Sequence, residues 1–273
     1  MLKDYKLMVA DVDATLRWYG TNPGPLTLSA FRQMHKQGIL LGIASGRPLW
    51  EELENHAADW GLDFQFDLII GMNGGEILDT RKNTKEILNP LSRETIKEII
   101  TKMEIMGVKP SIYLEGCTMA LEMNDMLKRS RERHNHQVII ADDVSEFWRE
   151  PNLKIMYRCP DAETASKVEA FGHSISNDRY CCFRTGTIMV EFQDPRNSKG
   201  AAIRKYCEDN NIKQIEIMAF GDAENDIEML KYAGTGISVA NGLPEVKAIS
   251  SDVTRFDAAH DGVGDYLYQQ FGL

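Results

Sequence analysis

The chain has 273 residues, of which 43% are hydrophobic and 26% charged, and its formal net charge is −10 at pH 7. This is the composition of a globular protein, and at about 150 residues per domain the length suggests two domains or one large one. A net negative charge without a long basic run argues against nucleic-acid binding and against binding to an anionic membrane surface. No apolar run in the sequence approaches the roughly 18 residues of a transmembrane helix, and the charged N-terminus does not resemble a secretion signal.

The five cysteines are odd in number and irregularly spaced. Together with the lack of a recognisable secretion signal, this pattern is typical of free thiols in a reducing compartment. We therefore expect a cytoplasmic protein whose cysteines form no disulfides.

The first third of the chain alternates strand-like apolar runs with helix-like segments. In chain order these are a strand at 6–10, a helix at 28–37 with Thr27 as its N-cap, a strand at 39–44, a helix from Pro48 to Trp60, and a strand at 67–70. Strands that alternate with helices in this way predict a doubly wound, parallel α/β sheet of the Rossmann-like kind.

The middle of the chain has a different pattern, with two hairpins among its predicted elements. These elements are a helix at 92–106, a hairpin of 111–114 and 118–122, a helix at 124–133, strands at 137–140 and 153–157, a helix at 162–171, and a hairpin at 180–192. Hairpins predict an antiparallel sheet, so we expect a separate α+β domain at 84–189, inserted into a core formed by 1–83 and 190–273. The last third returns to alternating segments, with helices at 198–209 and 224–231 and strands at 216–220 and 236–240.

Polar residues follow three of the predicted strands of the core. Asp11 and Asp13 follow the first, Ser45 and Gly46 follow the second, and the segment 221–226 follows the strand at 216–220. In doubly wound sheets, ligands bind outside the carboxyl ends of the strands, so these groups are expected to converge. Each group alone is also typical of an ordinary turn. The prediction depends on finding all three groups at the ends of strands in the same sheet.

Four carboxylates are expected to meet at this edge, from Asp11, Asp13, Asp222 and Asp226. Carboxylates that lie so close repel one another and need cations nearby. A hard divalent ion with oxygen ligands, typically Mg²⁺, is the natural partner, and Lys199 supplies a further positive charge.

These segments resemble the four motifs of the haloacid dehalogenase-like (HAD) hydrolases, in particular the Cof-type phosphatases with a type IIB cap. The motifs are, in order, Asp11-x-Asp13-x-Thr15, Ser45-Gly46-Arg47, Lys199, and Gly221-Asp222-x-x-Asn225-Asp226. The segments Asn73-Gly74-Gly75 and Asp261-Gly262-Val263 also resemble features of this subfamily. The resemblance covers nearly the whole chain and implies a Rossmann-like HAD core with an inserted α+β cap.

The resemblance implies a Mg²⁺-dependent phosphatase that works through an aspartyl-phosphate. Asp11 is then the nucleophile, and Asp13 is the group that protonates the leaving oxygen and afterwards activates water. The metal is implied to bind Asp11, the carbonyl of Asp13, and Asp222, with Asp226 as a further ligand or as support for one.

The remaining motif residues are implied to bind the phosphoryl group or to position the loops around it. They are Thr15, Ser45, Gly46, Lys199 and Asn225. The implied substrate is a small phosphorylated metabolite, either a sugar phosphate or a phosphorylated cofactor, with no nucleic-acid or membrane partner. The oligomeric state is left open.

Two departures from the family pattern leave alternatives open. Ala14 stands where the family usually has Gly, and its methyl group is tolerated unless the backbone requires a positive φ. The segment around Asn241-Gly242 differs from the residues that the family usually has at this place. The contact that this segment is implied to make on the phosphate side of the site is therefore in question. The alternatives are a phosphomutase of the same fold, and a phosphometabolite-binding protein that has lost turnover.

Overall fold

The computed structural model describes residues 4–50, 52–134 and 137–273, which form two compact units. One unit runs as far as Glu86 and resumes at Ser198, and the other comprises Ile87–Asn197. The sequence prediction assigned residues 190–197 to the core. They group instead with the inserted unit, because strand β11 (Met189–Gln193) pairs there with β9 (Lys154–Arg158) and β10 (Cys181–Arg184). Residues 84–86, which the prediction assigned to the inserted domain, group with the core.

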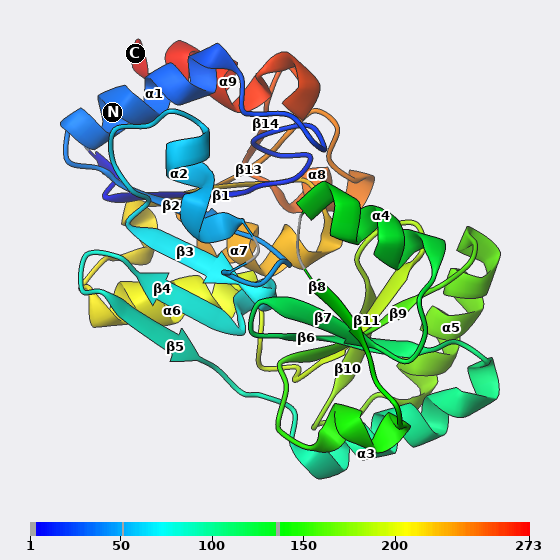
Figure 1. Ribbon diagram of the computed structural model, residues 1–273. Helices are drawn as coiled ribbons and strands as arrows, with labels where there is room; N and C mark the ends of the chain where they lie inside the picture. The colour runs from blue at the N-terminus through cyan, green and yellow to red at the C-terminus, as the bar shows by residue number, and fades with distance from the viewer. Residues whose placement is uncertain (1–3, 51, 135–136) are drawn as a thin grey trace. The chain divides into compact units, whose positions relative to one another are not determined.

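The first unit is built on an eight-stranded sheet with the order β14-β13-β12-β1-β2-β3-β4-β5 (Figure 1). Its strands are β1 (Leu7–Asp11), β2 (Leu40–Ala44), β3 (Leu68–Gly71), β4 (Glu76–Asp79), β5 (Thr84–Ile87), β12 (Ile217–Gly221), β13 (Thr235–Ser238) and β14 (Asp252–Val253). The strands from β14 to β3 run parallel, which confirms the predicted doubly wound sheet. The strand β4, which was not predicted from the sequence, pairs antiparallel with β3. The connection Met72–Gly75 is too short for the crossover that a parallel pair requires.

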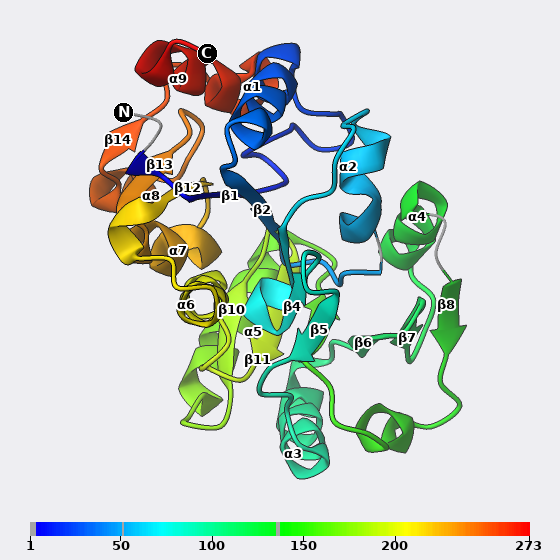
Figure 2. The same cartoon turned by 90° about the vertical axis from the view of Figure 1, so that its left-hand side faces the viewer.

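Helices cover both faces of this sheet. They are α1 (Pro25–Lys36), α2 (His56–Asp59), α6 (Lys199–Asp209), α7 (Ile227–Tyr232), α8 (Pro244–Ile249) and α9 (Gly262–Phe271). The helices α1 and α9 lie side by side, as Figures 1 and 2 both show, and Phe31 and Leu267 from them pack on Met8 and Ile43 of the sheet. Because side chains alternate along a strand, Leu7 and Val9 face the opposite side, where α6 and α7 pack against each other.

Two of the predicted helices differ in the structure. The first begins at Pro25 rather than residue 28, so Thr27 lies inside α1 and is not its N-cap. Proline is well suited to the first position of a helix, because its fixed φ matches the helix and its missing N–H costs nothing there. The helix predicted from Pro48 to Trp60 is reduced to a 3₁₀ turn, Leu53–Asn55, followed by the short α2.

The second unit contains a six-stranded sheet with the order β10-β11-β9-β6-β7-β8. Its elements are α3 (Arg93–Met103), β6 (Pro110–Leu114), β7 (Cys117–Ala120), α4 (Asp125–His134), β8 (Gln137–Ile140), β9 (Lys154–Arg158), α5 (Ala162–Ile175), β10 (Cys181–Arg184) and β11 (Met189–Gln193). Both predicted hairpins are present, and among the described residues of this unit the pair β7 and β8 alone is parallel. Apolar side chains of α3 and α5, such as Ile99 and Val168, form a core with Ile155, Tyr157 and Phe192 of this sheet.

All five cysteines are free thiols, as the sequence predicted. Among the described residues, no helix combines the length and the apolar character needed to span a bilayer.

Candidate active site

Asp11 is the last residue of β1, a strand that lies between β2 and β12 and is completely buried. Its carboxylate oxygen Oδ1 accepts a hydrogen bond of 2.5 Å from the ammonium group of Lys199. The same ammonium donates to Oδ1 of Asp226 at 2.6 Å. Lys199 is fully buried, so its charge is balanced inside the protein by these two carboxylates.

Lys199 reaches Asp11 because it is the first residue of α6 and this end of the helix approaches the turn after β3 closely. Gly74 in that turn has a φ of +98°, and a β-carbon there would lie 2.1 Å from the carbonyl oxygen of Ser198. Only glycine fits such an approach, so the Asn73-Gly74-Gly75 segment helps to place the lysine.

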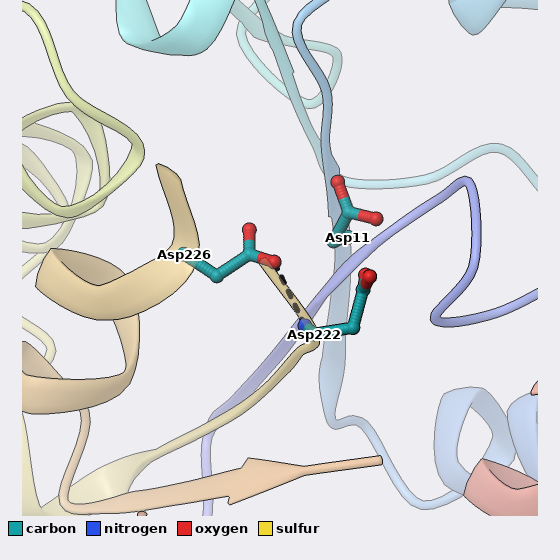
Figure 3. Close-up of side chains that lie close together, drawn as sticks. All are labelled: Asp11, Asp222 and Asp226. Atoms are coloured by element: carbon teal, nitrogen blue, oxygen red, sulfur yellow. Dashed lines mark hydrogen bonds between the residues drawn. The ribbon is translucent and has the colours of Figure 1, made fainter. Parts of the chain in front are cut away.

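Asp222 follows β12 and completes a group of three carboxylates. One oxygen from each of Asp11, Asp222 and Asp226 lies within 4.8 Å of the others, and Figure 3 shows their side chains gathered at the strand ends. Oδ1 of Asp222 accepts a hydrogen bond of 2.7 Å from the hydroxyl of Thr15. Asp226 orders the loop itself, because its Oδ2 accepts from the backbone N–H groups of Asp222 at 2.9 Å and of Ala223 at 3.1 Å.

Burial dominates the electrostatics of this group. It raises the pKa of Asp11 well above its usual range, against the opposing effect of Lys199. Burial, reinforced by the charge of Asp226, raises the pKa of Asp222 to about 6. Burial lowers the pKa of Lys199, but the carboxylates of Asp11 and Asp226 outweigh it and raise that pKa overall, so the lysine stays protonated. Three carboxylates with one ammonium leave an excess of negative charge, which suits a divalent cation with oxygen ligands.

The carboxylate of Asp13 is not one of these three and pairs with two arginines. Its Oδ1 accepts from Nε of Arg17 at 3.1 Å, and its Oδ2 accepts from Nε of Arg47 at 2.9 Å. Both guanidinium groups also donate to Oε2 of Glu52, at 3.3 Å and 3.4 Å. Asp13 is therefore held by cations from two different segments of the chain.

Ser45 and Gly46 follow β2 and are joined to the turn after β3. The backbone N–H of Asn73 donates to the carbonyl of Ser45 at 3.0 Å, and a β-carbon on Gly46 would lie 3.0 Å from Oδ1 of Asn73. That same Oδ1 accepts a hydrogen bond of 3.1 Å from the side-chain amide of Asn225. Asn73 thus links the segment after β2 to the segment after β12.

A sequence model of one family matches nearly the whole of this chain, from residue 8 to residue 267, and it describes haloacid dehalogenase-like hydrolases. The chain belongs to this HAD family. It is 24% identical over 253 residues to the HMP-PP phosphatase of Yersinia pseudotuberculosis, a match that covers 89% of this chain and 86% of that protein.

Solved structures of other HAD proteins have the same fold. One is a haloacid dehalogenase-like hydrolase from Bacteroides thetaiotaomicron, with a TM-score of 0.82 and 23% identity over 98% of this chain and 100% of that one. Another is the HAD subclass IIB sugar phosphatase BT4131, with a TM-score of 0.80 and 22% identity over 98% of this chain and 99% of that one. The likeness identifies the fold as a Rossmann-like HAD core with a cap domain.

Within this HAD chain, the two unusual segments meet. Ala14 has a φ of +67°, so the backbone does take the left-handed conformation that glycine favours. Its carbonyl accepts a hydrogen bond of 2.8 Å from the side-chain amide of Asn241, whose oxygen accepts from the N–H of Ala258 at 2.9 Å. Asn241 therefore contacts the loop after β1, where the sequence had suggested a contact on the phosphate side.

Sequence reasoning missed three contributors to this HAD site: Arg17, Glu52 and Asn73. Asn73 lies in a segment that was noted only as a subfamily feature, and Arg17 follows directly on the first motif, so both carried a signal. Glu52 accepts from the nearby Arg47 and from the more distant Arg17, and no local pattern marks it. Asn241 lies in a segment that the sequence had singled out, but its partner, Ala14, is remote in sequence.

Proposed function

We propose that this HAD hydrolase cleaves phosphomonoesters of small metabolites through an aspartyl-phosphate on Asp11. The observation that carries the proposal is the setting of Asp11, at the carboxyl end of a buried strand, bonded to a buried ammonium and beside two further carboxylates. When a carboxylate attacks a phosphoryl group, a nearby cation must balance the negative charge of the phosphoryl oxygens. The ammonium group of Lys199 supplies that cation here.

Mg²⁺ fits the donor set, because Asp11, Asp222 and Asp226 offer hard oxygen ligands within 4.8 Å of one another. We assign these three side chains to the metal, together with the backbone carbonyl of Asp13. When bound, the ion neutralises charge on the phosphoryl oxygens.

In the first step, a carboxylate oxygen of Asp11 attacks phosphorus and the ester P–O bond breaks. Asp13 gives a proton to the leaving oxygen, so an alcohol departs and the phosphoryl group stays on Asp11. In the second step, water attacks phosphorus while Asp13 takes its proton. The bond from Asp11 to phosphorus then breaks, which releases inorganic phosphate and restores both carboxyl groups.

The phosphoryl oxygens are proposed to bind Lys199, the hydroxyl of Ser45 and the backbone N–H of Gly46. The oxygen of Ser45 accepts from the N–H of Arg47 at 3.2 Å, which orients the hydroxyl and leaves its proton for a ligand. Thr15 and Asn225 act on the loops, since Thr15 holds Asp222 and Asn225 holds Asn73.

The names of two similar proteins, an HMP-PP phosphatase and a sugar phosphatase, support a substrate class. We propose a sugar phosphate or a phosphorylated cofactor, with the inserted unit, Ile87–Asn197, acting as the cap that selects among them.

The proposal is tested with a panel of sugar phosphates, nucleotides, flavin mononucleotide, pyridoxal phosphate and p-nitrophenyl phosphate, assayed with Mg²⁺ and with EDTA. Wild type should release phosphate only with the metal. Asp11→Asn should lose that activity by a factor of about 10³ or more, with unchanged circular dichroism, because its amide is a poor nucleophile. Full activity in Asp11→Asn would overturn the proposal.

The same panel distinguishes the two alternatives. An isomeric sugar phosphate as product would favour the phosphomutase, and metal-dependent binding without phosphate release would favour a binding protein.

A further inference from the structure

Arg17 occupies an unusual place beside the proposed proton-transfer group. It lies four residues after Asp13, and its side chain is 9% exposed, less than that of Asp13 at 16% or Arg47 at 20%. Each oxygen of the Asp13 carboxylate is bonded to a different guanidinium group, Oδ1 to Arg17 and Oδ2 to Arg47.

The backbone of the loop brings Arg17 into this position. The N–H of Ala14 donates to the carbonyl of Arg17 at 2.7 Å, and the N–H of Arg17 donates to the carbonyl of Val12 at 3.1 Å. The loop thus closes on itself directly after Asp11, and Asp13 and Arg17 form a local bridge within it.

Glu52 fixes the other end of both arginines. Its Oε2 accepts from Nη2 of Arg17 at 3.3 Å and from Nη1 of Arg47 at 3.4 Å. Planar guanidinium groups that bond at two places have little rotational freedom, so the two arginines form a fixed frame around Asp13. Without Arg17, Oδ1 of Asp13 would lose this bond and the carboxylate would be held from one side only.

We propose that Arg17 is a positioning residue, which holds the carboxylate of Asp13 in the orientation from which it exchanges protons with the leaving oxygen. This inference rests on the proposed function, in which Asp13 transfers that proton. Proton transfer requires its partners within hydrogen-bond reach, so the rotation of one carboxylate is enough to slow it.

A residue that positions the proton donor should affect substrates according to their leaving group, whereas a residue with a purely structural role should affect all substrates alike. Esters with a poor leaving group, such as an alkyl or sugar phosphate, need a proton donor as the P–O bond breaks. An ester with a good leaving group, such as p-nitrophenyl phosphate, needs it little. Loss of Arg17 should therefore reduce the hydrolysis of the first class more than that of the second.

The test compares kcat/KM of wild type, Arg17→Leu and Arg17→Lys for p-nitrophenyl, phenyl and alkyl phosphates with saturating Mg²⁺. The ratio kcat/KM reports the phosphorylation step, so the dephosphorylation step common to all substrates does not enter. In Arg17→Leu we expect the loss for the alkyl ester to exceed the loss for the p-nitrophenyl ester by about tenfold or more. Arg17→Lys keeps the charge without the planar group and should restore part of the difference.

Arg32→Leu is the matched control, because Arg32 lies on α1 and donates to the carbonyl of Gly61, away from the carboxylates. It should leave the ratio between the esters unchanged. An equal loss on all esters in Arg17→Leu, or no loss, would overturn the inference while leaving the proposed function intact. If wild type cleaves none of the esters, or Asp11→Asn still cleaves them, the proposed function itself fails.

Discussion

Ala14, in the loop that follows the proposed nucleophile, has a backbone conformation that is unfavourable for alanine. Its φ of +67° is in the left-handed region, which costs a residue with a β-carbon roughly 1–2 kcal/mol. The conformation is kept by hydrogen bonds from its N–H to Arg17 and from Asn241 to its carbonyl.

Ala14→Gly should therefore raise the free energy of unfolding by about 1 kcal/mol, since glycine adopts this φ freely but gains entropy in the unfolded chain. Urea denaturation measures the change. Ala201→Gly, within helix α6, is the control of opposite sign and should lose about 1 kcal/mol. A loss of stability in Ala14→Gly would show that the methyl group itself stabilises the loop.

Asp222 couples the proposed metal site to pH. Its pKa is raised to about 6, above its value in an unfolded chain, so without metal its contribution to stability is present at low pH and is lost as pH rises through about 6. Metal binding requires the ionised form, so below that pH a proton must first be displaced.

The increase in Tm on adding Mg²⁺ should accordingly be larger at about pH 7.5 than at about pH 5. Thermal unfolding at several Mg²⁺ concentrations measures it. In Asp222→Asn, which cannot ionise, the Mg²⁺ effect should be small at both values. An equal Mg²⁺ effect at both pH values in wild type would contradict the role assigned to Asp222.

At the level of elements, Asp261 shows how a segment remote in sequence determines where a helix begins. Its carboxylate accepts from the N–H groups of Leu26 at 2.7 Å and Thr27 at 3.1 Å, and from the hydroxyl of Thr27 at 2.5 Å. Gly24 leaves room for it, since a β-carbon there would lie 2.2 Å from the carboxylate. Asp261 therefore caps α1 from the segment that precedes α9.

Asp261→Ala should lower the free energy of unfolding by about 1–2 kcal/mol, because the first N–H groups of α1 lose their acceptor. Asp261 itself has a φ of +59°, which asparagine tolerates better than alanine does. Asp261→Asn, which keeps an acceptor oxygen, should consequently retain most of the stability. Equal losses in both variants, measured by urea denaturation, would rule out the capping role.

The elements that the sequence predicted correctly differ in their pattern from those that it missed. Buried strands such as β1 and β2 are continuous apolar runs, and the groups that follow them were identifiable because chemistry concentrates at strand ends. The strand β5 (Thr84–Ile87) is largely exposed and reads as a polar segment, so no apolar pattern marked it. The cap of α1 was assigned to Thr27 because local rules consider only nearby residues, whereas the acceptor belongs to Asp261.

At the level of the whole molecule, the two units have separate hydrophobic cores. The first core contains side chains from α1, α9 and the eight-stranded sheet, and the second contains side chains from α3, α5 and the six-stranded sheet. The chain enters and leaves the inserted unit at neighbouring points, since the side-chain amide of Asn197 donates to the carbonyl of Leu88 at 3.0 Å.

A chain in which a short Gly-Ser linker joins Glu86 to Ser198 should therefore fold, because its core keeps all its members. We expect cooperative thermal unfolding and a Tm that still rises with Mg²⁺. Circular dichroism and calorimetry measure both properties. A shortened chain that is unfolded under conditions where the full chain is native would show that the first unit depends on the second.

Asp11 is the residue whose chemistry decides the proposed mechanism, and chemical trapping examines it directly. Borohydride reduces an aspartyl-phosphate to homoserine, so enzyme quenched during turnover with Mg²⁺ and substrate, then reduced and digested, can be read by mass spectrometry. We predict homoserine at position 11, absent when substrate or Mg²⁺ is omitted. Turnover that leaves Asp11 unmodified, or a homoserine at position 13 or 222 instead, would contradict the mechanism.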